Sequence, residues 1–234
     1  MSSPEVNHPR SIKSFVIRSG RMTAGQLKAY EHLWDKYGVE AGESELDFSE
    51  IFTRAAPVIL EIGFGMGDSL LAMAERYPEN NYLGIEVHKP GVGRLLGNIA
   101  EHNVSNLKVM QSDAVQVLKK QIKDHSLQAV YLFFPDPWHK KRHHKRRIVK
   151  DEFVQLVGQK LQTHGYFHMA TDWEDYSRQM LKTMQRASGF KNCAVDCVTN
   201  GGYIPRPDYR PVTKFERRGE RLGHGVWDIL FKKI

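Results

Sequence analysis

The sequence has 234 residues and a formal net charge of +7, and 41% of its residues are hydrophobic. This length suits one domain with an extension, and the hydrophobic fraction is enough for a sizeable core. No apolar run approaches the roughly 18 residues of a membrane helix, and no apolar stretch at the start reads as a secretory signal, so we expect a cytoplasmic protein that does not enter a membrane. The basic balance favours a polyanionic partner.

The first 54 residues are polar and include a basic arm. Residues 22–37 predict one short helix, with Thr23 as its N-cap. We expect residues 1–54 to form this arm and helix, and residues 55–234 to form the main domain. The arm's cations are Arg10, Lys13, Arg18 and Arg21.

From about residue 57, apolar runs alternate with segments of helical spacing. The expected strands are 58–60, 82–87, 107–110, 127–134 and 166–170, and the expected helices are 69–77, 92–102, 115–122, 153–161 and 173–187. This alternation predicts a doubly wound α/β fold with a mostly parallel sheet. Two further strands, 190–198 and 226–231, follow without a helix between them, which predicts an antiparallel pair at the sheet edge.

The first strand runs into a glycine-rich turn, Glu61-Ile62-Gly63-Phe64-Gly65-Met66-Gly67. Glycines at this place let the backbone bend and approach a ligand closely. The spacing is G-x-G-x-G, which differs from the G-x-G-x-x-G of dinucleotide folds. Glu61 would repel a pyrophosphate and suits the ammonium of a methionine moiety, so the turn predicts a nucleotide cofactor site, with S-adenosylmethionine as the favoured cofactor.

Acidic residues also end the next two strands. Glu86 is placed to accept hydrogen bonds from ribose hydroxyls, and Asp113, with the N–H of Ala114, is placed to bind adenine. The alternative is that each carboxylate only caps the helix that follows it. Glu86 alone would also suit the ribose of NAD, so a nicotinamide oxidoreductase is a competing interpretation that Glu61 and the glycine spacing disfavour.

The fourth strand runs into Pro135-Asp136-Pro137-Trp138. Two prolines stiffen this loop and hold Asp136 in a defined place. The chain so far resembles the class I S-adenosylmethionine-dependent methyltransferases, and this resemblance implies that the end of the fourth strand faces the reacting methyl group. Methyltransferases that act on exocyclic amines carry a similar Asp/Asn-Pro-Pro-aromatic loop. An aspartate between the prolines departs from that pattern and disfavours amine methylation.

Residues 139–147 form a run of six cations and three histidines directly after this loop. Its place beside the expected reaction centre favours phosphate contacts with a nucleic acid over a solvated charge run. A metal site is not expected, because no cysteine or carboxylate cluster accompanies the histidines. Farther along, Asp172 ends the fifth strand or caps the next helix, and residues 210–219 read as a polar surface hairpin.

Four segments together resemble one family, the bacterial tRNA (guanine-N7-)-methyltransferases, which belong to the class I S-adenosylmethionine-dependent methyltransferases. The segments are Leu60-Glu61-Ile62-Gly63-Phe64-Gly65-Met66-Gly67, Phe134-Pro135-Asp136-Pro137-Trp138-His139-Lys140-Lys141-Arg142-His143, Ala170-Thr171-Asp172 and Thr213-Lys214-Phe215-Glu216. The resemblance implies a seven-stranded sheet whose last strand is antiparallel, and methylation of N7 of guanosine 46 in the tRNA variable loop.

The resemblance also implies roles for individual residues. The implied cofactor contacts are Glu61, Gly63, Glu86, Asp113, Ala114 and Asp136, of which Asp136 is also the catalytic residue. The implied guanosine contacts are Lys140, Asp172, Thr213, Lys214, Phe215 and Glu216. The implied RNA contacts are Arg142, His143, His144, Lys145, Arg146 and Arg147. We expect tRNA as the partner and a monomer as the working form, with a homodimer as the alternative.

The chemistry of N7 limits what Asp136 has to do. N7 of guanine carries a free lone pair, so no general base is required, and positioning supplies most of the catalysis of an in-line displacement. The purine gains positive charge, which a carboxylate at Asp136 would stabilise. Carboxylates at Asp172 and Glu216 match the donors on the Watson–Crick edge of guanine. The remaining alternatives are methylation of another nucleic acid, such as ribosomal RNA, and an RNA-binding module with an inactive cofactor site.

Overall fold

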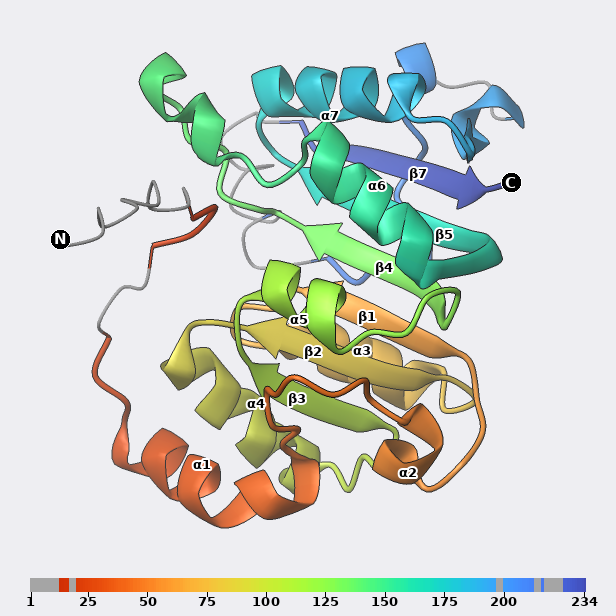
Figure 1. Cartoon of the computed structure of the whole chain (residues 1–234). Coiled ribbons are helices and arrows are strands. Elements are labelled where there is room, and N and C mark those ends of the chain that lie inside the picture. Colours follow the sequence, from red (N-terminus) through yellow and green to blue (C-terminus); the bar gives the residue numbers. More distant parts are fainter. Residues whose placement is uncertain (1–12, 17–19, 197–199, 213–215, 217–224) are drawn as a thin grey trace, which may run out of the picture.

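The computed structural model of the chain describes residues 13–16, 20–196, 200–212, 216 and 225–234. Its centre is a seven-stranded sheet with the strand order β3-β2-β1-β4-β5-β7-β6 (Figure 1). The strands are β1 Val58–Ile62, β2 Asn81–Glu86, β3 Leu107–Gln111, β4 Leu127–Phe133, β5 Leu161–Thr171, β6 Phe190–Asn192 and β7 Trp227–Lys233. β1 to β5 are parallel, and β7 is antiparallel to both of its neighbours, β5 and β6. The predicted fold class and the antiparallel pair at the edge are therefore confirmed.

Helices cover both faces of this sheet. The helices are α1 Ala24–Tyr37, α2 Phe48–Phe52, α3 Asp68–Arg76, α4 Lys89–Glu101, α5 Ala114–Lys120, α6 Asp151–Lys160 and α7 Glu174–Arg186. One core cluster joins one face of the strands to α2, α5, α6 and α7, and a second joins the other face to α3 and α4, with Tyr37 at the end of α1. Neighbouring residues of a strand go to opposite clusters, as Leu60 and Ile59 of β1 do. This division explains why β1 is buried along its whole length.

The N-terminal helix packs on the domain through α4. The hydroxyl of Thr23 accepts from the N–H of Gln26, whose side chain accepts from the N–H of Thr23, so the predicted N-cap forms a full capping box. The two helices lie close because α4 has a glycine where they touch. A Cβ atom on Gly93 would lie 2.5 Å from the carbonyl oxygen of Gln26.

Two segments differ from the sequence-based expectation. β5 begins at Leu161, five residues before the expected start, and β6 ends at Asn192 and gives way to a 3-10 turn, Cys193–Asp196. The basic run folds into the 3-10 helix η1, Lys141–Arg146. Among the described residues, no helix is long and apolar enough to cross a membrane.

Candidate active site

Acidic residues line the edge of the sheet where the parallel strands end. Glu86 is the last residue of β2, and Glu61 precedes the last residue of β1. Asp113, Asp136 and Asp172 follow the ends of β3, β4 and β5. Because these five strands are parallel neighbours, all five carboxylates gather at one edge, which is where ligands bind in open α/β sheets.

The glycine-rich turn after β1 depends on glycine for its backbone shape. Gly63, Gly65 and Gly67 have φ angles of +74°, +61° and +80°, in the region that favours glycine. A Cβ atom at Gly63 or Gly65 would meet nothing within 4 Å, so the turn has open space on that side. At Gly67 a Cβ would lie 2.7 Å from Leu95, so this glycine is required for packing against α4.

Glu61 carries a buried carboxylate that needs a partner. The residue is 3% exposed, and its Oε2 has no hydrogen-bond partner among the described residues. Burial, followed by the negative charge of Glu86, raises the pKa of Glu61 to about 8. An ammonium group would supply both the missing donor and the missing positive charge, so the residue fits the methionine moiety of the expected cofactor.

Glu86 is held in place by backbone donors. Its Oε2 accepts from the N–H of Gly65 at 2.8 Å, and its Oε1 accepts from the N–H groups of Val87 at 2.6 Å and His88 at 2.9 Å. These contacts fix the carboxylate against the glycine turn. Three of the roughly four acceptor sites of the carboxylate are thus used, and Oε2 can still accept a further hydrogen bond, as contact with a ribose hydroxyl would require.

Asp113 caps the helix that follows it. Its Oδ1 accepts from the N–H of Val115 at 3.0 Å, while Ala114 begins α5 and is buried. The capping interpretation is thus confirmed for one carboxylate oxygen. The expected adenine contact would use the other oxygen, and it stays a proposal.

The loop after β4 holds Asp136 in an exposed position between two strained residues. Phe134 and Trp138 have φ angles of +51° and +50°, which costs a residue other than glycine about 1–2 kcal/mol each. Neighbouring contacts maintain this shape. The N–H of Phe134 donates to the carbonyl of Ala170 at 2.8 Å, and the indole N–H of Trp138 donates to the carbonyl of Ser14 at 3.2 Å. The surroundings therefore position Asp136 more firmly than the prolines alone would.

Arg147 was expected to contact RNA, but the structure gives it a different place. Its side chain is 2% exposed, and its guanidinium donates to the carbonyl of Pro137 and to the side chains of Gln179 and Asp175, at 2.7–2.8 Å. It also lies 4.7 Å from the centre of the Tyr176 ring. This correction makes Arg147 the link that ties the Asp136 loop to α7.

The other members of the basic run remain near the surface. Lys140, Arg142 and Lys145 are exposed, and the Arg146 guanidinium lies 4.9 Å from the centre of the Trp138 ring. His144 is half-buried, and its Nε2 lies 4.0 Å from Asp175. Burial, followed by the charges of its basic neighbours, lowers the pKa of His143 from its usual 6.5. We call residues 139–146 the basic hook, and it presents several cations beside Asp136.

The expected guanosine contacts differ in accessibility. Asp172 is half-buried just beyond β5 and Lys140 is exposed, so both are open to a ligand. Glu216 is 3% exposed, and each of its carboxylate oxygens accepts from Arg210 at 2.8 Å. In this structure its carboxylate binds an arginine and does not line an open site, which differs from the expected contact with guanosine. Thr213, Lys214 and Phe215 lie outside the described residues.

The sequence interpretation missed a buried polar cluster around Arg210. Residues 210–219 read as a polar surface hairpin, whereas Arg210 is 0% exposed and binds Asp228 as well as Glu216. His168, also 0% exposed, binds Asp228 at 2.9 Å. The available signal was an aspartate inside the otherwise apolar run 226–231, which requires a buried partner.

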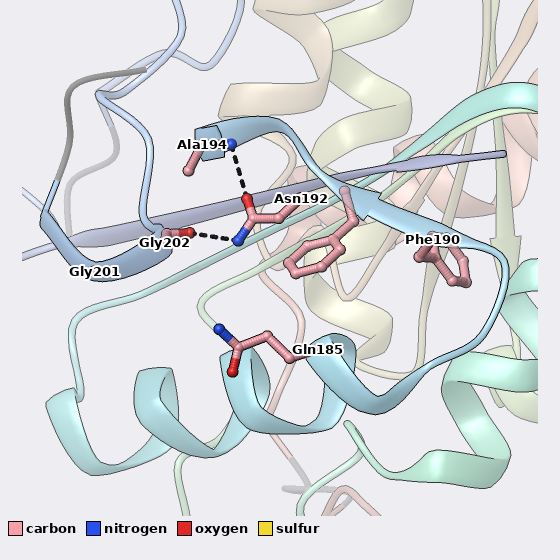
Figure 2. A pocket seen from close by; sticks show the side chains of 7 residues that line it. Gln185, Phe190, Asn192, Ala194, Gly201 and Gly202 are labelled. Atoms are coloured by element: carbon pink, nitrogen blue, oxygen red, sulfur yellow. Dashed lines mark hydrogen bonds between the residues drawn. The ribbon is translucent and has the colours of Figure 1, made fainter. Parts of the chain in front are cut away.

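A separate hollow lies beside β6 (Figure 2). In the sheet, β4, β5 and β7 lie between β6 and β1, so the hollow is distant from the acidic residues of β1 and β2. In it the side chain of Asn192 donates to the carbonyl of Gly202 and accepts from the N–H of Ala194. Its lining includes no ionisable side chain and none of the expected site residues; the lining residues are Gln185, Phe190, Asn192, Ala194, Gly201, Gly202 and Phe231.

Comparison with known proteins decides the family. A family model described as "Putative methyltransferase" matches residues 55–229. A tRNA (guanine-N(7)-)-methyltransferase of Hydrogenovibrio crunogenus is 56% identical over 227 residues, which cover 97% of this chain and 93% of the relative. A protein of the same name from Shewanella amazonensis is 55% identical over 225 residues, which cover 96% and 93%. The chain belongs to the tRNA (guanine-N(7)-)-methyltransferase family.

Solved structures place this family member within a wider fold group. A 16S rRNA methyltransferase, KamB, superposes with a TM-score of 0.57 at 13% identity, covering 80% of this chain and 92% of that one. At that identity the likeness shows the fold alone. The resemblance expected from the sequence motifs, to the family and to the class I methyltransferase fold, is confirmed.

Proposed function

We propose that this chain transfers a methyl group from S-adenosylmethionine to N7 of guanosine 46 in the variable loop of tRNA. The observation that carries the proposal is the pairing of two features at one sheet edge. A buried, unpartnered Glu61 lies beside an open glycine turn, and the loop of Asp136 continues directly into a hook of exposed cations. The first feature suits a cationic methyl donor and the second suits a polyanion.

The cofactor would be held by the acidic edge. Glu61 would bind the ammonium, Glu86 the ribose hydroxyls, and Asp113 with the N–H of Ala114 the adenine, while Gly63 leaves room for the ligand. The bound sulfonium supplies an activated methyl group. Everything else in the reaction depends on how the chain's own residues hold the guanine.

Asp136 would stabilise charge and would not remove a proton. Bound S-adenosylmethionine would supply its methyl group to the N7 lone pair, and the purine would gain the positive charge that the sulfonium loses. An exposed carboxylate on a stiff loop stabilises this charge as it develops, without reorganising during the reaction. Asp172 would accept from the N1–H and N2–H₂ donors of the flipped base, and Lys140 with the rest of the hook would bind phosphates.

We also propose that the enzyme works in the cytoplasm and as a monomer, since one chain supplies the acidic edge, the Asp136 loop and the basic hook. A mass measured by light scattering during gel filtration tests the second statement, and twice the chain mass would contradict it.

One experiment tests the activity directly. The protein is incubated with methyl-labelled S-adenosylmethionine and bulk tRNA from a strain lacking the gene, and the tRNA is then digested to nucleosides. We expect label in 7-methylguanosine, with wild-type transcripts methylated and transcripts carrying adenosine at position 46 unmodified. Label in another nucleoside, or none, would contradict the proposal.

A further inference from the structure

Arg147 binds the loop of Asp136 and helix α7 with the same guanidinium. Its Nε donates at 2.8 Å to the carbonyl of Pro137, the residue directly after Asp136. Its Nη1 and Nη2 donate to the side chains of Gln179 and Asp175, both at 2.7 Å. The side chain is 2% exposed, so these acceptors replace the hydrogen bonds that water would otherwise make. The backbone of the Asp136 loop is thus joined to α7 through one enclosed cation.

The start of α7 also holds the chain on either side of this link. The Arg147 guanidinium lies 4.7 Å from the centre of the Tyr176 ring, whose hydroxyl accepts from the N–H of Val149 at 3.3 Å. At the other end of the basic hook, the His139 ring packs edge-on against the Trp173 ring, with the ring centres 4.1 Å apart. The chain that contains the basic hook is therefore fastened to the start of α7 at both ends.

Helix α7 begins close to the residue expected to read the guanine. Asp172 follows the last residue of β5, and α7 starts at Glu174. In the proposed function Asp136 stabilises charge, while Asp172 binds the donors of the base. These two carboxylates follow the ends of neighbouring parallel strands, β4 and β5. Arg147 hydrogen-bonds to the loop of the first and to the helix that follows the second, so it constrains how far apart the two carboxylates lie.

Two other roles suit Arg147 less well. An RNA contact would require the guanidinium to leave all three acceptors, whereas Arg142 and Lys145 of the basic hook are already exposed. Stability alone is a weak reason to bury a cation, because apolar residues of similar size often stabilise a fold as well. What arginine adds is a planar fork that fixes the geometry of the groups it binds. The residue is accordingly suited to holding a loop in place.

We propose that Arg147 is a positioning residue for methyl transfer, which sets the place of Asp136 relative to Asp172 by holding the Pro137 carbonyl against α7. Without the fork the loop keeps its sequence and its charge, but its carboxylate no longer lies where charge develops on the purine. This inference rests on the proposed function, and it gives Arg147 and its partners on α7 a part in that function.

A mutant cycle tests the inference. The variants are Arg147→Lys, which keeps the charge and loses the fork, Asp136→Asn, and the two combined. Each is measured for S-adenosylhomocysteine affinity by calorimetry, for tRNA affinity and its salt dependence by filter binding, and for single-turnover methyl transfer at saturating tRNA and cofactor, per cofactor-binding site. Arg186→Lys is the control, because Arg186 ends α7 and pairs with Asp151 of α6 at 3.3 Å.

We expect Arg147→Lys to slow saturated methyl transfer about 100-fold, the loss that a misplacement of about 1 Å produces. Affinities for cofactor and tRNA should stay within about twofold of the wild type, with the same salt dependence, because the enclosed charge binds no phosphate. The double variant should be slower than Asp136→Asn by no more than about threefold, because Arg147 acts through Asp136. Arg186→Lys should keep the wild-type rate.

A second variant covers the case in which Arg147→Lys does not fold. Asp175→Ala then takes its place in the cycle, since Asp175 is exposed and its loss removes one acceptor of the fork. It should slow saturated methyl transfer about tenfold, as expected for the loss of one hydrogen bond between charged groups.

Three results would overturn the inference. A normalised rate near the wild type would mean that Arg147 only stabilises the fold. Multiplicative losses in the double variant would mean that Arg147 affects the reaction independently of Asp136. Weaker tRNA binding with a lower salt dependence would mean that Arg147 contacts RNA. Failure of the proposed function is distinguishable, because the wild-type protein would then form no 7-methylguanosine at all.

Discussion

Replacing Glu61 by Gln should separate two opposite effects of its buried carboxyl group, which strengthens cofactor binding and destabilises the cofactor-free fold. At pH 7, one unit below its pKa of about 8, the carboxyl is roughly 90% protonated in the cofactor-free protein. It must lose this proton to bind an ammonium. Affinity for S-adenosylhomocysteine should therefore rise about ninefold from pH 6 to pH 7 and about fivefold from pH 7 to pH 8, and it should fall at higher pH as the ligand's own α-amino group loses its proton.

The same pKa shift predicts the change in stability. Because the folded pKa lies above the ordinary value of 4.5, the fold disfavours the ionised form, and the cofactor-free protein loses stability as pH rises from about 4.5 to about 8. By pH 7 this loss is on the order of 3 kcal/mol, from 1.36 kcal/mol per pKa unit. Glutamine does not titrate, so Glu61→Gln should raise Tm by several degrees, since about 1 kcal/mol moves it about 2–4 °C in a protein of this size.

Calorimetry at pH 6, 7, 8 and 9, in buffers of different ionisation enthalpy, measures both affinity and proton release. Wild-type protein should release close to one proton from Glu61 per bound ligand at pH 7. Glu61→Gln should bind S-adenosylhomocysteine about 10–100-fold more weakly than the wild type at pH 8, and its affinity should not rise between pH 6 and 8. Glu101→Gln, at an exposed residue of α4, is the control and should match the wild type. A wild-type affinity that does not change between pH 6 and 8 would refute the reasoning.

Three further outcomes follow from the site. Asp136→Asn should slow single-turnover methyl transfer about 100-fold, and a wild-type rate would rule out its electrostatic role. Arg146→Ala should weaken tRNA binding and lower the slope of log affinity against log salt concentration by about 1. Arg147→Ala should instead lower the free energy of unfolding by about 3 kcal/mol. Equal effects of the two variants in both assays would refute this distinction. Gly91→Ala would place a Cβ 2.0 Å from the carbonyl oxygen of Gly65 and should abolish S-adenosylhomocysteine binding, while Gly25→Ala, with open space around it, should leave binding intact.

The sheet and its acidic edge could be predicted because each depends on local sequence. Runs such as Val58-Ile59-Leu60 are apolar because both faces of the strand are covered, and a parallel strand necessarily presents its last residues at the common edge. The Thr23 cap and the glycine turn are local for the same reason: their hydrogen bonds and backbone angles involve residues next to one another.

Burial of charged side chains could not be predicted in this way, because it depends on partners that are distant in the chain. Arg147 stands in a run of exposed cations, and its partners Asp175 and Gln179 lie 28 and 32 residues later. Arg210, in a loop, binds Asp228, which lies 18 residues later in β7. Sequence patterns show where charge is concentrated, and only the packing shows which members of the run are enclosed.

The reversed direction of β7 has a consequence for how the enzyme matures during synthesis. The five parallel strands and their carboxylates, through Asp172, are complete before β7 is made, so a growing chain can already form the cofactor edge. Asp228 enters with β7, which inserts between β5 and β6 and covers the open edge of β5. Until that insertion the exposed strand edge favours pairing with other chains, and Arg210 lacks one of its two carboxylates. Competence to bind cofactor should therefore arise earlier in translation than competence to methylate RNA.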